Sequence, residues 1–176
     1  MSVEIRPIRR TDVPAVVAMV HELADYERAP RECHLTDAQL EAALFAESPA
    51  LFGHIALLDG EAVGMALWFL NFSTWRGVHG VYLEDLYVRP SARGKGVGRA
   101  LLATLAAVCT DRGYERLEWW VLHWNPAREF YHSIDAVAMD EWVPYRLAGP
   151  ALHALAATAP VTGAGDLEPS LRGDAG

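Results

Sequence analysis

Residues 82–99 read YLEDLYVRPSARGKGVGR, and this stretch decides the fold of the chain. Its first half has the apolar and aromatic content of a buried strand, which we expect over residues 80–88. Arg89 and Pro90 then lead into a glycine-rich loop, and an alanine- and leucine-rich helix is predicted over about 97–112. A further strand follows this helix, so the segment forms a βαβ unit. We therefore predict an α/β fold with a mixed central sheet and flanking helices.

The remaining elements are expected on both sides of this unit. Upstream, the patterns predict a strand at 3–8, helices at 12–28 and 37–45 capped by Thr11 and Thr36, and strands at 52–58 and 62–72 joined at Asp59-Gly60. Downstream, they predict a strand at 116–122, a short helix from Asn125-Pro126, a strand at 141–147 that ends the sheet, and a helix at 151–158. We expect one domain over residues 1–159 and a disordered tail over 160–176.

Composition excludes several classes of protein. The chain has 176 residues, with 15 lysines and arginines against 23 aspartates and glutamates, and a net charge of −8 disfavours a nucleic-acid binder. The cysteines, Cys33 and Cys109, and the seven histidines show no metal-ligand spacing, so no metal is expected. No apolar stretch is long enough to span a membrane and no signal peptide is visible, which predicts a cytoplasmic protein.

The loop at residues 93–99 has the properties of an anion site. It leads into a helix N-terminus, where backbone N–H groups lack partners within the helix and the helix dipole favours negative charge. Glycines at 94, 96 and 98 let a bulky pyrophosphate approach, and the basic side chains at 93, 95 and 99 add charge. The Ser/Thr of a P-loop and the spacing of the dinucleotide fingerprint are absent. Alone, the segment is also compatible with a glycine turn bearing a solvated basic tip.

Other motifs remove much of that ambiguity. Arg93, Gly96 and Gly98, with Trp124-Asn125 and Phe130-Tyr131 further on, resemble the acetyl-CoA site of the GNAT N-acetyltransferase superfamily. His21-Glu22-Leu23-Ala24 with Tyr26-Glu27, then Trp75 and Gly77, and above all Tyr82-Leu83-Glu84-Asp85 resemble its diamine (spermidine/spermine) acetyltransferase branch. The resemblance covers roughly residues 3–147.

This resemblance implies a GNAT fold whose two central parallel strands splay apart, and acetyl-CoA as the co-substrate. Backbone groups of Leu86, Tyr87 and Val88 would hold the pantetheine arm, and one N–H would polarise the thioester carbonyl. The pyrophosphate would contact Arg93, Gly94, Lys95, Gly96, Val97, Gly98 and Arg99, and Asn125 would also contact the cofactor. An amine would attack the thioester directly in a ternary complex, with Glu84 as proton acceptor and Tyr131 as general acid. A homodimer is also implied.

Several of these residues are also compatible with a purely structural role. Asn125 before Pro126 also fits a plain helix N-cap. Tyr131 is compatible with a core aromatic. Glu84 and Asp85 are expected on opposite faces of a strand, so that one of them is free to be a solvated charge. One residue fewer than usual separates Asn125 from Tyr131, which also leaves a CoA-binding module without catalysis as an alternative.

The substrate is expected to be a primary amine of a small molecule. Tyr26, Glu27, Trp75, Glu84 and Asp85 are the predicted binding residues, and their carboxylates suit a polyamine or diamine. However, Arg28 and Arg31 follow where the diamine enzymes are more acidic, and two arginines would repel a polycation and suit a carboxylate. An amino acid with a side-chain amine, such as lysine or thialysine, is therefore the rival substrate, and acetylation of a protein amine is a weaker possibility.

Overall fold

The computed structural model describes residues 2–160. The chain divides into two units, residues 1–128 and 129–176, and each is described by itself.

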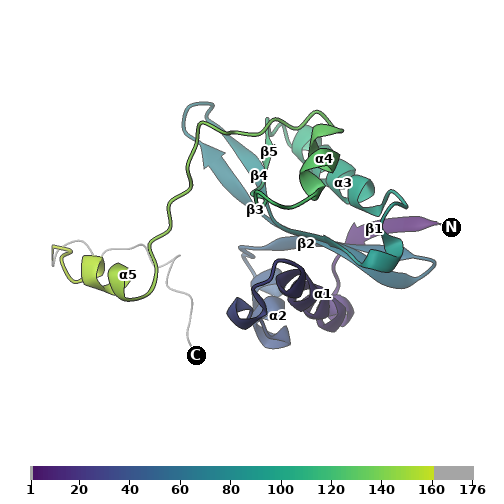
Figure 1. The fold of residues 1–176 in the computed structure, drawn as a ribbon, viewed down its shortest axis with the longest axis horizontal. Helices are drawn as coiled ribbons and strands as arrows, with labels where there is room; N and C mark the ends of the chain where they lie inside the picture. Colours follow the sequence, from purple (N-terminus) through teal and green to yellow (C-terminus); the bar gives the residue numbers. More distant parts are fainter. Residues whose placement is uncertain (1, 161–176) are drawn as a thin grey trace. The chain divides into compact units, whose positions relative to one another are not determined.

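The first unit contains a five-stranded mixed sheet (Figure 1). Its strands, in spatial and chain order, are β1 (Val3–Pro7), β2 (Phe52–Leu58), β3 (Glu61–Ser73), β4 (Val78–Val88) and β5 (Leu117–Glu118). The pairs β1–β2, β2–β3 and β3–β4 are antiparallel, and β4–β5 is parallel. The mixed sheet is thus confirmed, and the helix between β4 and β5 supplies the crossover that a parallel pair needs.

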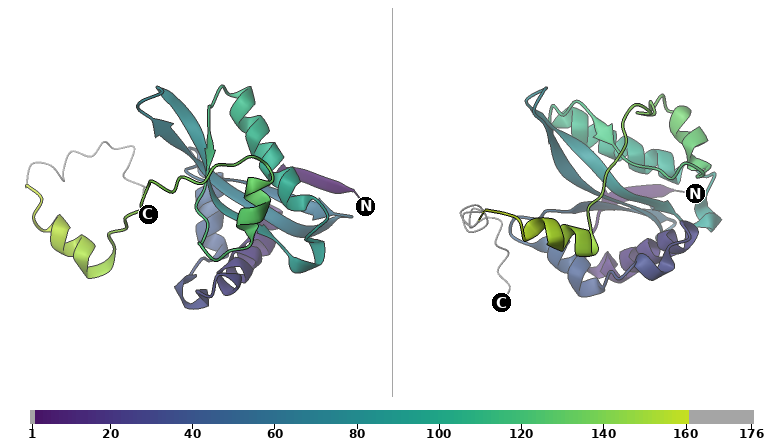
Figure 2. Two further views of the ribbon diagram at one scale, coloured as in Figure 1. Left: turned by 45° about the horizontal axis from the view of Figure 1, so that its top comes forward. Right: turned by 60° about the vertical axis from the view of Figure 1, so that its left-hand side comes forward.

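Helices cover both faces of this sheet (Figure 2). The helices α1 (Val13–Tyr26) and α2 (Asp37–Phe45) lie on one face, and α3 (Val97–Asp111) lies on the other. Short 3-10 turns occur at Arg10–Asp12, Pro30–Glu32 and Pro90–Ala92. The helix α4 (Ala127–His132) runs across the boundary of the two units, and α5 (Gly149–Ala156) belongs to the second.

The hydrophobic core explains which helix faces the sheet. Val16 and Met19 of α1 are fully buried and pack with Leu40 of α2 and Ile55 and Met65 of the sheet. Leu101 and Leu105, one turn apart on α3, are also fully buried. These positions follow the helical period, so each helix buries an apolar stripe against the pleated surface.

Several local predictions are confirmed. Thr36 caps α2, accepting a hydrogen bond from the Gln39 N–H at 3.3 Å, and Gln39 completes a capping box. The hairpin turn between β2 and β3 falls at Asp59 and Gly60, which have φ of 52° and 86°. Positive φ at both central residues is typical of the type I′ turn that Asp-Gly sequences favour.

Three local predictions are wrong. Thr11 does not cap α1: the helix begins after Asp12, whose carboxylate accepts hydrogen bonds from the Arg9 N–H and the Arg6 guanidinium. The expected strand at 116–122 shrinks to Leu117–Glu118, because only these two residues pair with β4. Residues 141–147 form no strand in the described structure. A sequence pattern can favour an extended segment, but a strand also needs a neighbouring strand to pair with, and the pattern does not provide one.

Candidate acetyl-CoA and amine site

The strands β4 and β5 separate after a short parallel contact. Val81 pairs with Leu117 and Tyr82 with Glu118, and Val81 donates its N–H to the Arg116 carbonyl at 3.0 Å. Beyond Tyr82, nothing in residues 2–160 pairs with β4 on this side. Residues 119–122 form no strand, so the splayed pair of strands that the resemblance implied stays a prediction. In the described residues β4 has an unpaired edge over residues 83–88.

A β-bulge determines which backbone groups face that edge. The pairing with β3 skips Glu84, because Trp68 lies opposite Leu83 and Leu67 opposite Asp85. Past the bulge, Arg89 donates its N–H to Val63 of β3 at 2.8 Å. Successive residues of a strand point their backbone N–H and C=O groups to alternate sides. The groups of Tyr87 therefore also point to β3, whereas those of Leu86 and Val88 point to the free edge. Of the three residues expected to hold the pantetheine arm, the geometry favours Leu86 and Val88.

The glycine-rich loop presents an uncapped helix N-terminus. Gly94 and Gly96 have φ of 74° and 81°, in the left-handed region that glycine adopts without strain. Gly96 is the N-cap residue of α3 and no side chain caps this helix, so the N–H groups of Val97, Gly98 and Arg99 are directed away from the helix. The side chains of Lys95 and Arg99 are exposed beside them. This arrangement suits a pyrophosphate.

Arg93 differs from the other basic residues of the loop. Its Nε donates to the Val88 carbonyl at 2.9 Å, and its guanidinium lies over the rings of Tyr26 and Tyr87, 4.9 and 5.7 Å from their centroids. In this structure Arg93 therefore fastens the loop to the end of β4 and to α1.

Glu27, Glu84 and Asp85 form an acidic cluster at the middle of β4. The end of α1 supplies Glu27, and the bulge supplies the other two. Burial is the main cause that raises the pKa of Asp85 to about 6, and the charges of Glu84 and Glu27 raise it further. Burial also raises the pKa of Glu27. Three mutually repelling carboxylates with no cation paired to them in residues 2–160 attract an ammonium group.

The bulge falls at one of these carboxylates. Glu84 is the extra residue of the bulge and has no partner on β3, whereas Asp85 lies opposite Leu67. Glu84 remains exposed while Asp85 is largely buried, and the charge of Glu84 acts on both Asp85 and Tyr82. The sequence did not reveal that the more buried carboxylate is Asp85.

The end of α1 packs against the turn at Trp124-Asn125. The hydroxyl of Tyr26 donates to the Asn125 Oδ1 at 3.4 Å, and the rings of Tyr26 and Trp124 lie 6.1 Å apart. The guanidinium of Arg28 lies over the Trp124 ring, 4.4 Å from its centroid. Two segments that are far apart in the sequence thus meet beside the acidic cluster.

Asn125 has a structural role. Its Oδ1 accepts a hydrogen bond from the Ala127 N–H at 2.9 Å, so Asn125 caps the first turn of α4. It is 9% exposed, and its side chain also binds Tyr26. The hydrogen bond from the Ala127 N–H supports the N-cap interpretation. Contact of Asn125 with the cofactor stays a prediction.

Tyr131 belongs to the second unit. It lies on α4 next to Phe130, with ring centroids 5.5 Å apart. The helix ends in a Schellman motif, in which Ala136 donates to the Tyr131 carbonyl and Asp135 takes the left-handed conformation at φ 61°. Asp135 thus occupies the position that glycine usually takes in such a cap. The sequence, with Asp135-Ala136 where the family usually has Gly-Ala, predicted a different cap, and that prediction is wrong.

Trp75 is not brought to the acidic cluster. It lies in the β3–β4 hairpin turn with 91% of its surface exposed. From Val78, where β4 begins, to Glu84 the strand advances by about 20 Å. The role of Trp75 in substrate binding therefore stays a prediction.

An ion pair that the motifs did not single out joins α1 to β4. The Arg89 guanidinium binds the Glu22 carboxylate through two nitrogens, at 2.8 and 3.1 Å, and also donates to the Ala62 carbonyl. Such a two-nitrogen pair holds the exit of β4 firmly. The sequence analysis placed Glu22 in a motif of the resemblance and Arg89 directly after the predicted strand, without a signal that the two would pair.

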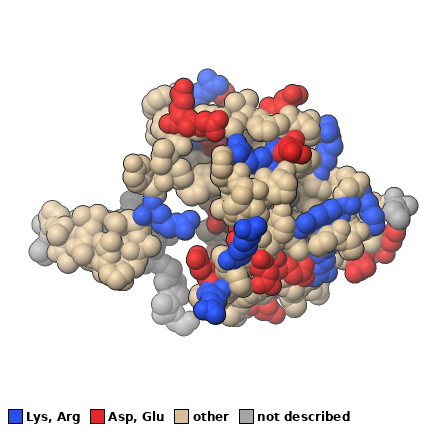
Figure 3. All heavy atoms as spheres, in the orientation of Figure 1, with Lys and Arg blue, Asp and Glu red and all other residues tan. Residues whose placement is uncertain are grey.

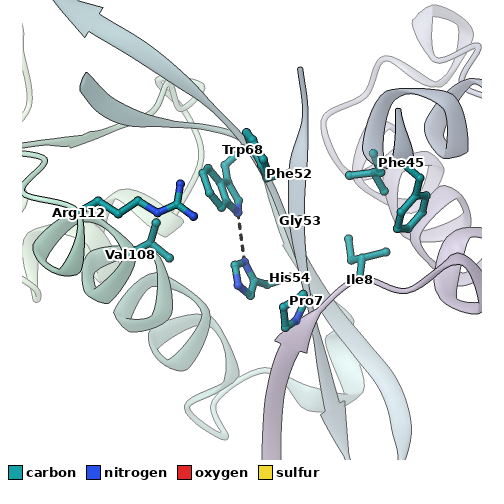
Figure 4. Close-up of a pocket in the computed structure, with 10 residues that line it drawn as sticks. Pro7, Ile8, Phe45, Phe52, Gly53, His54, Trp68, Val108 and Arg112 are labelled. Carbon is teal, nitrogen blue, oxygen red and sulfur yellow. Dashed lines mark hydrogen bonds between the residues drawn. The ribbon is translucent and has the colours of Figure 1, made fainter. Parts of the chain in front are cut away.

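A pocket of about 270 Å³ lies elsewhere in the first unit (Figure 4). It is lined mainly by apolar residues, among them Phe52, Trp68 and Val108, and the Trp68 Nε1 donates to the His54 Nδ1 at 3.1 Å. Val108 and Arg112 stand at the C-terminal end of α3, about 20 Å along the helix from the glycine-rich loop. This pocket is therefore separate from the candidate site. Within residues 2–160, no group of histidine, cysteine or acidic side chains is arranged to hold a metal.

The mixed sheet, the unpaired edge of β4 and the uncapped N-terminus of α3 form the arrangement that the resemblance implied for an acyl-CoA-dependent transferase. The profile of the acetyltransferase (GNAT) family matches residues 16–134, and the chain belongs to that family. Enzymes of this family use acetyl-CoA.

The chain is similar to proteins of known name. It is 34% identical to a thialysine N-epsilon-acetyltransferase of Caenorhabditis elegans, over 87% of this chain and 96% of that protein. It is 26% identical to the human spermidine/spermine N(1)-acetyltransferase-like protein 1, over 81% of this chain and 22% of that protein. Among solved structures, an integron cassette protein from the mobile metagenome of V. cholerae has a TM-score of 0.74 and 30% identity, covering 89% of this chain and 98% of that one.

Proposed function

We propose that this acetyltransferase moves the acetyl group of acetyl-CoA to a primary amine of a small molecule. The acidic cluster of Glu27, Glu84 and Asp85 carries the proposal, because it stands beside the free edge of β4 where the thioester would lie. The polyamine or diamine predicted from the sequence and the rival amino acid both present such an amine. The similarity to acetyltransferases named for thialysine and for spermidine supports small amines as the substrate class.

The proposed reaction uses the site in a defined order. The N–H of Leu86 would polarise the thioester carbonyl, and Glu27 and Asp85 would hold the incoming ammonium. Glu84, exposed at the bulge, would take a proton from the ammonium through water. The free amine then forms a C–N bond as the C–S bond breaks, and Tyr131 would protonate the departing CoA thiolate. The nitrogen gives up its second proton as the amide forms, and the Tyr131 phenolate would regain a proton through water. Gly94, Lys95, Gly96, Val97, Gly98 and Arg99 would bind the pyrophosphate.

A thiol-release assay tests this proposal. Acetyl-CoA would be offered with spermidine, putrescine, cadaverine, lysine, ornithine and thialysine, and the release of free CoA would be followed. We expect turnover with at least one amine. Binding of acetyl-CoA without release under any amine would instead favour the CoA-binding module without catalysis.

Replacement of Tyr131 tests the proposed general acid. We expect Tyr131→Phe to reduce turnover by about 100-fold or more with nearly unchanged acetyl-CoA affinity, since only protonation of the leaving thiolate is lost. The thiol-release assay measures turnover, and titration calorimetry measures the affinity for acetyl-CoA. Equal turnover by the variant would remove Tyr131 from the mechanism.

Two further predictions belong to this proposal. The first is a homodimer, which the resemblance implies, and the second is the cytoplasmic location predicted from the sequence pattern. No helix of the described residues is long and apolar enough to cross a membrane.

A further inference from the structure

We propose that Arg28 binds the carboxylate of the substrate, so that the preferred amines are amino acids with a side-chain amine. This inference rests on the proposed function and names the substrate class for the same site. Three features of Arg28 carry the inference. They are its left-handed backbone conformation, the stacking of its guanidinium on Trp124, and its positive charge without an acidic partner among residues 2–160.

Arg28 occupies a backbone position at which its own side chain is unfavourable. The helix α1 ends in a Schellman motif, with Ala29 donating to the Ala24 carbonyl at 2.9 Å and Arg28 donating to the Asp25 carbonyl at 3.1 Å. The residue at this place takes the left-handed conformation, and Arg28 has φ of 63°. Glycine is strongly preferred there. An arginine held in this strained conformation is best explained by a function of its side chain.

Stacking holds the Arg28 guanidinium in place and leaves its N–H donors available for a carboxylate. The guanidinium stacks on the Trp124 ring at 4.4 Å, and Trp124 is 43% exposed. Stacking uses the flat face of the guanidinium and leaves its N–H groups at the edge, in the fork geometry that matches a carboxylate. Within residues 2–160, Arg28 forms no ion pair with any acidic side chain. It is therefore a free, oriented carboxylate receptor.

The surroundings place this receptor next to the amine site. Glu27, which precedes Arg28 in the chain, belongs to the acidic cluster and its charge acts on Asp85. Tyr26 contacts both Trp124 and Asn125, so the Trp124 turn is anchored to the end of α1. Red and blue side chains are correspondingly interspersed over α1 and α2 in Figure 3. A substrate with an ammonium at one end and a carboxylate at the other complements this arrangement, whereas a polyamine would be repelled by Arg28.

The test compares amino acids with their decarboxylated counterparts. Lysine is paired with cadaverine and ornithine with putrescine, and kcat/KM is measured for the wild type and for Arg28→Gly. Glycine suits the backbone at φ 63°, so the variant is expected to fold with a melting temperature close to that of the wild type. Arg31→Ala is the matched control, because it removes the same charge from the neighbouring exposed turn.

We expect the wild type to prefer the amino acids, and Arg28→Gly to lower their kcat/KM by about 10- to 100-fold, as loss of a charge-assisted hydrogen bond predicts. The diamines should be unaffected or improved, and Arg31→Ala should change neither pair. A wild-type preference for diamines, an equal loss for both members of a pair, or a selective loss in Arg31→Ala would overturn the inference.

Calorimetric titration of the CoA-bound protein with the same pairs makes the comparison without turnover. Selective loss of lysine binding in Arg28→Gly supports the inference even when no amine is acetylated, and that lack of turnover would count against the proposed function alone.

Discussion

Asp85 has an environment that differs strongly from that of a solvated side chain. Its carboxyl is buried beside two other carboxyls, and its pKa is raised to about 6 from an ordinary value of 3.8. Between these two pH values the folded protein holds more protons than the unfolded chain. The free energy of unfolding therefore falls as the pH rises from about 4 to about 6, and stays lowered above that. The folded protein thus keeps a destabilising charge at the place where an ammonium would bind.

We expect Asp85→Asn to make the protein more stable at pH 7, by up to about 3 kcal/mol, and to lower amine turnover strongly. The stability gain should vanish near pH 3 and below, where the wild-type carboxyl is mostly protonated in both states. Urea unfolding at pH 3 and pH 7 measures the gain. Glu84→Gln is the control, since Glu84 is exposed and its replacement should change stability little. A less stable Asp85→Asn at pH 7 would contradict this account.

At the scale of elements, the N-terminus of α3 and the free edge of β4 supply the proposed cofactor site. The sequence predicted the loop and the helix well, because glycines and a helical apolar stripe are local signals. It did not predict the bulge at Glu84, since a bulge depends on the register with β3, which no local pattern encodes. Nor could alternation alone decide that residues 141–147 remain unpaired in the described structure.

We expect Gly96→Val to abolish acetyl-CoA binding. A branched side chain at φ 81° is strained and stands where the pyrophosphate would approach, although a Cβ there meets no atom within 4 Å. Gly60→Val is a matched control, because Gly60 has φ of 86° and an equally open Cβ position in the β2–β3 turn. Titration calorimetry should show no binding for the first variant and wild-type affinity for the second. Retained binding by Gly96→Val would rule out the proposed cradle.

At the scale of the whole molecule, the resemblance predicts a homodimer. The second unit contains several large apolar side chains, among them Trp142, Val143 and Tyr145. Side chains of this kind commonly contribute to protein interfaces. We expect sedimentation equilibrium to give twice the mass of the chain, and Trp142→Ser with Tyr145→Ser to shift it toward the monomer. A wild-type monomer at micromolar concentration would refute this prediction.

The central claim is that the chain transfers acetyl from acetyl-CoA to a small amine bound at Glu27, Glu84 and Asp85. Mass spectrometry of a reaction with acetyl-CoA and the preferred amine of the panel tests it most directly. The account predicts an amine carrying one acetyl group, formed in equal amount to the CoA released, and its loss in Asp85→Asn. Release of CoA without acetylated amine, or undiminished product from Asp85→Asn, would contradict the account.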